Sequence, residues 1–194
     1  MIDRTLLSKA AQDLLALNAD QAYRKLTVDG GDGFAPAREV LRALKPADVL
    51  AKPIVRSDEA QAVLAGLWLW HDWLDESHTI SQGIHTATGS YWHAIMHRRE
   101  GDFSNSKYWY AKCAGHPVKK AIAPKAAEIV RGSKAAQAVS AVLLGGFDPN
   151  ALVDLAEDVH RRPDDPARET IIALQQAEWQ ALFEQSVKAA VDQK

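Results

Sequence analysis

Residues 60–82 read AQAVLAGLWLWHDWLDESHTISQ, and this stretch decides how the chain folds. From Ala60 to Leu74 the side chains are apolar on nearly every face of a helix, which is typical of a central, largely buried helix. Ser57 or Asp58 is a suitable N-cap, and Gly83 lies just beyond the expected end. We therefore predict one long, buried helix near residues 58–82.

The segments on either side of this helix also have helical composition. Alanine, leucine, glutamate, glutamine and lysine dominate them, and few runs alternate with the period of a strand. The prediction is an all-α, single-domain bundle of roughly 8–9 helices, in which residues 1–55 pack on a core formed by residues 56–194. Besides the central helix, the expected helices cover residues 6–17, 22–26, 36–44, 91–100, 105–113, 119–130, 134–144, 151–161 and 167–191. Ser90 and Gly101 are expected to bound the 91–100 helix, and residues 29–33 are expected to form a surface loop.

Composition, charge and cysteine count indicate the class of protein and its expected location. The chain has 194 residues, 47% of them hydrophobic, and a formal net charge of -2, so nothing in its overall charge favours nucleic acid as a partner. No apolar run approaches the ~20 residues of a membrane span, and the N-terminus lacks the pattern of a signal peptide. Cys113 is the only cysteine, so no intrachain disulfide can form. A cytoplasmic protein is the simplest expectation.

Five of the seven histidines lie between His71 and His97, and helical spacing groups them with carboxylates. Because a helix turns about 100° per residue, one face of the 58–82 helix should present His71, Asp75 and His78. The 91–100 helix repeats this spacing with His93, His97 and Glu100. If residues 83–89 connect the two as an antiparallel hairpin, four imidazoles and two carboxylates converge between the helices.

Three interpretations of this convergence remain open. His71, His78, His93 and His97 are candidate ligands of a divalent transition metal such as Zn, Fe or Mn. Without a metal, the same histidines are candidate catalytic acids and bases, oriented by Asp75 and Glu100. In the third interpretation the pairs are purely structural hydrogen bonds, and no HExxH motif decides among the three.

Polar and aromatic residues near the histidines are candidates for binding a ligand. Asp72 and Glu76 are expected to pair with Arg98 and Arg99, although two guanidinium groups also suit a phosphate or carboxylate. Small polar side chains and aromatic rings, Trp109 among them, follow in residues 101–110 and suit hydrogen bonding and stacking. The predicted ligand-binding residues are Asp72, Glu76, Trp92, Arg98, Arg99, Asn105, Lys107 and Tyr108.

Three short blocks carry a resemblance to a known family. They are HDxLDESH at residues 71–78, YWHAIMHRRE at residues 91–100 and SNxKYW at residues 104–109. This pattern resembles a family of uncharacterised proteins of about this length, with no activity known for its members. The resemblance implies a shared site in this region but names no reaction.

These observations favour an enzyme that acts on a small polar or anionic molecule through a pocket between the two helices, with or without a bound metal. The alternatives are a non-catalytic binding module that uses the tryptophan, tyrosine and arginine cluster, and a protein in which the histidine–carboxylate pairs only fix the helix register.

Overall fold

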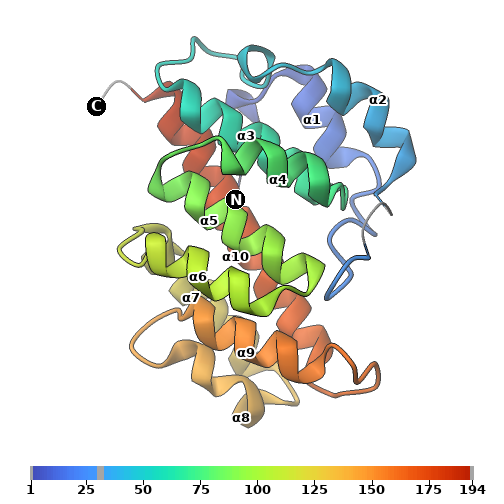
Figure 1. Ribbon diagram of the computed structural model, residues 1–194, viewed down its shortest axis with the longest axis vertical. Helices are drawn as coiled ribbons and strands as arrows, with labels where there is room; N and C mark the ends of the chain where they lie inside the picture. The colour runs from blue at the N-terminus through green and yellow to red at the C-terminus, as the bar shows by residue number, and fades with distance from the viewer. Residues whose placement is uncertain (1, 30–32, 193–194) are drawn as a thin grey trace.

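The computed structural model describes residues 2–29 and 33–192, and within these ranges the protein is an all-α helical bundle, as predicted (Figure 1). The described residues contain ten α-helices and three short 3-10 helices, and their only β-bridge joins Leu7 and Leu50. The α-helices are α1 (Lys9–Ala16), α2 (Ala35–Ala43), α3 (Ser57–Trp70), α4 (Leu74–Gln82), α5 (Ala87–Glu100), α6 (Phe103–Lys112), α7 (Val118–Gly132), α8 (Ala136–Val139), α9 (Pro149–Val159) and α10 (Arg168–Val191). No helix in these ranges is both long and apolar enough to cross a membrane.

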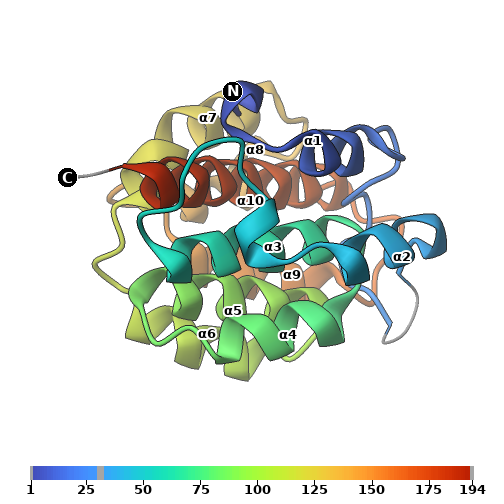
Figure 2. The same ribbon diagram turned by 90° about the horizontal axis from the view of Figure 1, so that it is seen from above.

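Helices α3 and α10 form the centre of the bundle. Every residue of α3 from Ala62 to Leu69 is buried, which agrees with its apolar sequence. Helix α10 packs against α3, α5, α7 and α9, and Figure 2 shows it between α7 on one side and α3 on the other. The indole N–H of Trp179 in α10 donates to the carbonyl oxygen of Gly66 in α3 at 3.0 Å. Helix α5 packs on α3 and carries α4 and α6 at its sides.

The predicted long helix over residues 58–82 is wrong at one point, because it divides into α3 and α4. The chain turns at His71 and Asp72, and Asp72 adopts a left-handed backbone with φ of 62°. Aspartate tolerates this conformation better than most residues. A segment distant in sequence stabilises the turn: the N–H of Phe34 donates to the carbonyl oxygen of His71 at 2.9 Å, and the indole of Trp73 donates to that of Phe34 at 3.3 Å.

Helix α5 starts earlier than predicted and ends where predicted. Its N-cap is Thr86 rather than Ser90, and the Thr86 hydroxyl accepts the N–H of Gly89. Gly101 ends the helix with φ of 88°, a conformation that glycine adopts without strain. Asp102 follows directly and caps α6 by accepting the N–H of Asn105, so α5 and α6 are joined by a short, well-defined turn.

Two other predicted helices are absent or shorter in the structure. Residues 22–26 form a turn and an irregular segment, and residues 134–144 contain only the short α8 and a 3-10 helix over Ser140–Leu143. The predicted surface loop at residues 29–33 falls mainly on residues 30–32, which lie outside the described residues.

Candidate metal centre

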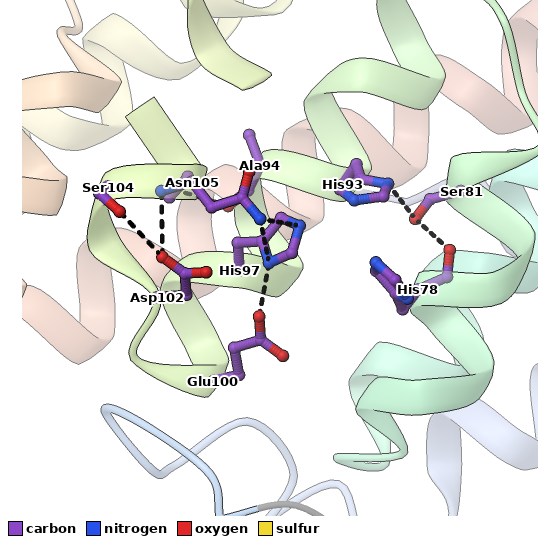
Figure 3. A network of polar contacts seen from close by, with 10 residues as sticks. His78, Ser81, His93, Ala94, His97, Glu100, Asp102, Ser104 and Asn105 are labelled. Carbon is purple, nitrogen blue, oxygen red and sulfur yellow. Dashed lines mark hydrogen bonds and ion pairs between the residues drawn. The ribbon is translucent and has the colours of Figure 1, made fainter. Parts of the chain in front are cut away.

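Three histidines from two helices face one another beside the α5–α6 turn. His78 comes from α4, and His93 and His97 lie one helical turn apart on α5. The ring centroids are 4.6 Å apart for His78 and His93, 5.3 Å for His78 and His97, and 4.6 Å for His93 and His97. One nitrogen from each ring can be chosen so that the three lie within 4.8 Å of one another. Figure 3 shows the three imidazoles in this arrangement, with His78 facing the other two across the helix pair.

His97 is held by a carboxylate on one side and an amide on the other. Its Nδ1 lies 2.5 Å from Oε1 of Glu100, so the carboxylate accepts the Nδ1 proton and the Nε2 lone pair faces away (Figure 3). The amide nitrogen of Asn105 lies over the ring, 3.0 Å from Nε2 and 3.4 Å from Nδ1. Carboxylates orient metal-binding histidines in this way. The amide is therefore off the Nε2 lone pair and does not occupy the position of a metal ion bound at Nε2.

His93 is the most enclosed of the three imidazoles. Its ring stacks on Trp109 of α6 at 4.1 Å between centroids, and its Nδ1 lies 3.5 Å from the hydroxyl of Ser81. Burial, followed by the charges of His97, His78 and Lys112, lowers the pKa of His93 to about 3. The ring is therefore neutral near pH 7, the form in which histidine binds a metal.

The donor set suits a transition metal after a small contraction. With Zn–N distances of about 2.0–2.1 Å, a tetrahedral site places its ligand nitrogens about 3.3 Å apart, closer than the present spread of up to 4.8 Å. The exposed carboxylate of Glu100, together with Asp102, forms a second group of potential ligands with His97. The centre thus combines three imidazoles with acidic groups near the protein surface.

Two residues expected to join the histidines lie elsewhere. The break between α3 and α4 turns His71 away, so that its Nε2 donates to the carbonyl oxygen of Leu14 at 3.0 Å and its ring stacks on Phe34. Asp75 is exposed near the start of α4, where it lines a shallow surface depression with Glu76 and Trp68. Of the four imidazoles and two carboxylates expected to converge, the structure brings together His78, His93 and His97, with Glu100 beside His97. The others were misplaced because the prediction assumed one continuous helix.

Arg98 lies in the core rather than at a ligand site. It is fully buried and forms an ion pair of 2.5 Å with Glu178 of α10. Its remaining nitrogens donate to Gln175 at 3.0 Å and to the hydroxyl of Tyr110 at 2.7 Å. Trp92, also predicted to bind a ligand, is likewise fully buried, and its indole donates to Ser186 at 3.3 Å.

The predicted pairing of Asp72 with an arginine is confirmed, since Asp72 forms an ion pair with Arg99. The Arg99 guanidinium is fully buried and lies 3.9 Å from the centre of the Tyr23 ring. Glu76 pairs instead with Arg38 of α2 at 3.1 Å. Both arginines thus face a carboxylate of the protein, although Nε and Nη1 of Arg99 have no acceptor among the described residues.

Residues 102–109 give a mixed outcome. Asn105 contacts His97, whereas Lys107 forms an ion pair with Asp154 of α9, and Tyr108 is 56% exposed. Ser81 was missed as a partner of His93, although its position three residues after His78 places it on the same side of a helix. Trp109, expected to offer a stacking face, stacks on the ring of His93.

No family model, no curated protein and no solved structure matches this chain. What the site does is therefore inferred from its own geometry and chemistry.

Proposed function

We propose that the protein is an enzyme that binds one divalent transition metal ion at His78, His93 and His97 and acts there on a small polar molecule. The observation that carries this proposal is the approach of three imidazole nitrogens from two helices to within 4.8 Å of one another. Three neutral imidazoles are a frequent ligand set of catalytic zinc. Iron and manganese remain alternative occupants, because carboxylates lie beside the histidines.

The surroundings of the histidines support metal binding over simple structural pairing. Glu100 and Ser81 approach the Nδ1 atoms of His97 and His93, and both contacts leave the Nε2 atoms directed elsewhere. A purely structural pair needs one imidazole and one carboxylate, whereas here three imidazoles are gathered around one point. Bringing three such rings together gives no obvious gain in stability without a shared ligand.

An ion held by only three protein ligands keeps a position for water or substrate and supplies Lewis acidity there. Glu100 and Asp102 lie at the solvent side of the centre, where a titratable group can exchange protons with a bound molecule. Arg98, Arg99 and Lys107 are paired within the protein. We therefore favour a neutral polar substrate over an anionic one. A cytoplasmic location remains part of the proposal, since Cys113 has no cysteine partner in the chain.

Cobalt substitution tests the proposal, because tetrahedral Co²⁺ has visible absorption bands that respond to a change in its ligands. We expect bands from the wild-type protein loaded with Co²⁺, and a shift of these bands when azide enters the open position. The His97→Ala variant should lose the bands. The His85→Ala variant, which changes an exposed histidine between α4 and α5, should keep them.

Each other outcome contradicts a defined part of the proposal. Bands that azide leaves unchanged indicate a closed, structural metal site and contradict the enzyme. Absence of bands in wild-type protein, or bands of equal strength in His97→Ala, contradicts the metal centre. If the wild-type protein shows no bands, the site is instead a metal-free binding module or a set of structural pairs.

A further inference from the structure

A cavity of about 360 Å³ lies between the N-terminal segment and the middle of the bundle, and none of the three histidines lines it. Its wall combines the end of α3 with one side of α10 and with residues of the N-terminal region. The residues that matter for its chemistry are Trp70, Trp179, Gln176, Gln180, Arg4 and Arg24. Its volume falls at the lower end of the range for small-molecule sites, about 300–1,000 Å³.

Two tryptophans give this cavity an aromatic surface. The rings of Trp70 and Trp179 are in contact, with centroids 4.5 Å apart. Trp179 donates its indole N–H to Gly66. The indole N–H of Trp70 has no acceptor among the described residues and is buried from solvent, so Trp70 offers the cavity its ring and not its donor.

The rim of the cavity is positively charged. Arg4 and Arg24 are exposed, and neither forms an ion pair with any residue in 2–29 or 33–192. No acidic side chain within residues 2–29 and 33–192 lines the cavity, although the chain as a whole has a net charge of -2. Two free guanidinium groups beside one cavity form a surface to which an anion is attracted.

The neighbouring amides add hydrogen-bonding groups at defined positions. Gln176 and Gln180 are one helical turn apart on α10, and the Gln176 amide nitrogen donates to the backbone oxygen of Tyr23 at 3.2 Å. This contact orients the Gln176 side chain and leaves its own carbonyl oxygen available. Aromatic surface, amides and cations therefore border one cavity.

We propose that this cavity, the Trp70–Trp179 pocket, binds a small aromatic anion. The planar ring packs against the two indoles, and the phosphate or carboxylate group contacts Arg4 and Arg24. A nucleoside monophosphate and an aromatic carboxylate share this chemistry. The proposal is independent of the metal centre, because no residue of that centre lines the pocket.

Isothermal titration calorimetry with four probes tests the pocket: adenosine monophosphate, adenosine, benzoate and inorganic phosphate. We expect saturable binding of at least one aromatic anion, about tenfold or more tighter than that of adenosine and of phosphate, because ring and charge are both recognised. Arg4→Gln and Arg24→Gln should each weaken binding by a similar factor. Both residues are exposed, so the fold should survive their replacement.

Matched variants separate this pocket from other effects. Arg131→Gln, which removes an exposed arginine of α7, and His97→Ala, which alters the metal centre, should bind the aromatic anion as the wild type does. Trp70→Phe keeps an aromatic ring at this position and should therefore retain binding of the aromatic anion. Equal affinity for adenosine and adenosine monophosphate, with no response to benzoate, would overturn the role of the arginines. Phosphate binding as tight as either aromatic anion would overturn the role of the ring, and no saturable binding of either aromatic anion would overturn the proposal.

Discussion

Arg98 and Arg99 are adjacent in sequence, fully buried, and paired with carboxylates of two different segments. Arg98 reaches Glu178 of α10, and Arg99 reaches Asp72 at the α3–α4 turn. A buried ion pair adds little net stability relative to an apolar pair, but loss of one partner leaves an uncompensated charge. Two side chains of α5 therefore connect this helix to α10 and to the turn between α3 and α4.

Glu178→Gln tests the Arg98 pair. Since it leaves a buried guanidinium without its counter-charge, we expect a loss of about 3–5 kcal/mol in the free energy of unfolding, measured with urea. The matched control is Glu128→Gln, which breaks an exposed ion pair with Lys125 and should leave the free energy of unfolding nearly unchanged. A loss for Glu178→Gln no larger than that of the control would contradict a stabilising role of this pair.

His71 and His116 make the stability of the protein depend on pH. Burial lowers the pKa of both to about 4. Below the unfolded pKa of about 6.5 the unfolded chain binds protons that the folded chain excludes, so stability is complete above about pH 7 and falls as the pH drops toward 4. At pH 5 each histidine should account for a loss of about 2 kcal/mol.

The measurement is the free energy of unfolding of metal-free protein at pH 7 and pH 5. In His116→Gln the difference between these pH values should be about 2 kcal/mol smaller than in the wild type. His85→Ala should show the wild-type difference, because this histidine is exposed. An unchanged difference in His116→Gln would show that His116 is not held neutral by the fold.

At the scale of the element, the helices differ in how far their sequences determine them. Two local signals in α5 gave correct predictions. The i, i+4 spacing placed His93 and His97 on one face of the helix, and the glycine at position 101 marked its end. The break between α3 and α4 has no glycine or proline to mark it. Its stabilising partners are Leu14, Phe34 and Arg99, which are distant in sequence. Periodicity alone therefore predicted one helix and placed His71 and Asp75 on the wrong face.

Asp72→Asn tests this explanation of the break. Asparagine tolerates the left-handed backbone but removes the charge facing Arg99, so we expect a loss of about 3 kcal/mol in unfolding free energy. Asp75→Asn is the control, because Asp75 is exposed and should change stability by no more than about 0.5 kcal/mol. Equal effects of the two variants would contradict the role of the Asp72–Arg99 pair in the turn.

The contact between α3 and α10 depends on the lack of a side chain at Gly66. A Cβ atom there would lie 2.9 Å from ring atoms of both Phe183 and Trp92. Gly66→Ala should therefore lower the free energy of unfolding by about 1–3 kcal/mol, despite the better helix propensity of alanine. Gly132→Ala, at the open end of α7, should be neutral or stabilising by up to about 1 kcal/mol. Thermal unfolding of both variants is the measurement. A Gly66→Ala variant as stable as the wild type would contradict the close approach of Phe183 and Trp92 to Gly66.

At the scale of the whole molecule, the bundle places two candidate sites on separate groups of helices. The histidines lie among α4, α5 and α6, and the Trp70–Trp179 pocket lies where the N-terminal segment meets α3 and α10. The sequence was sufficient to predict the helical class and the region of the histidine centre. It was insufficient for the second site, because Arg4, Trp70 and Trp179 meet only through long-range packing.

Zinc content is the most direct measurement of the central claim that His78, His93 and His97 bind one metal ion. Protein prepared without an affinity tag, equilibrated with zinc and dialysed, should contain one zinc ion per chain by elemental analysis. His78→Ala and His97→Ala should lose it while keeping the helical circular dichroism of the wild type, and His85→Ala should retain it. Wild-type protein without zinc, or zinc retained in full by folded His97→Ala, would contradict the account.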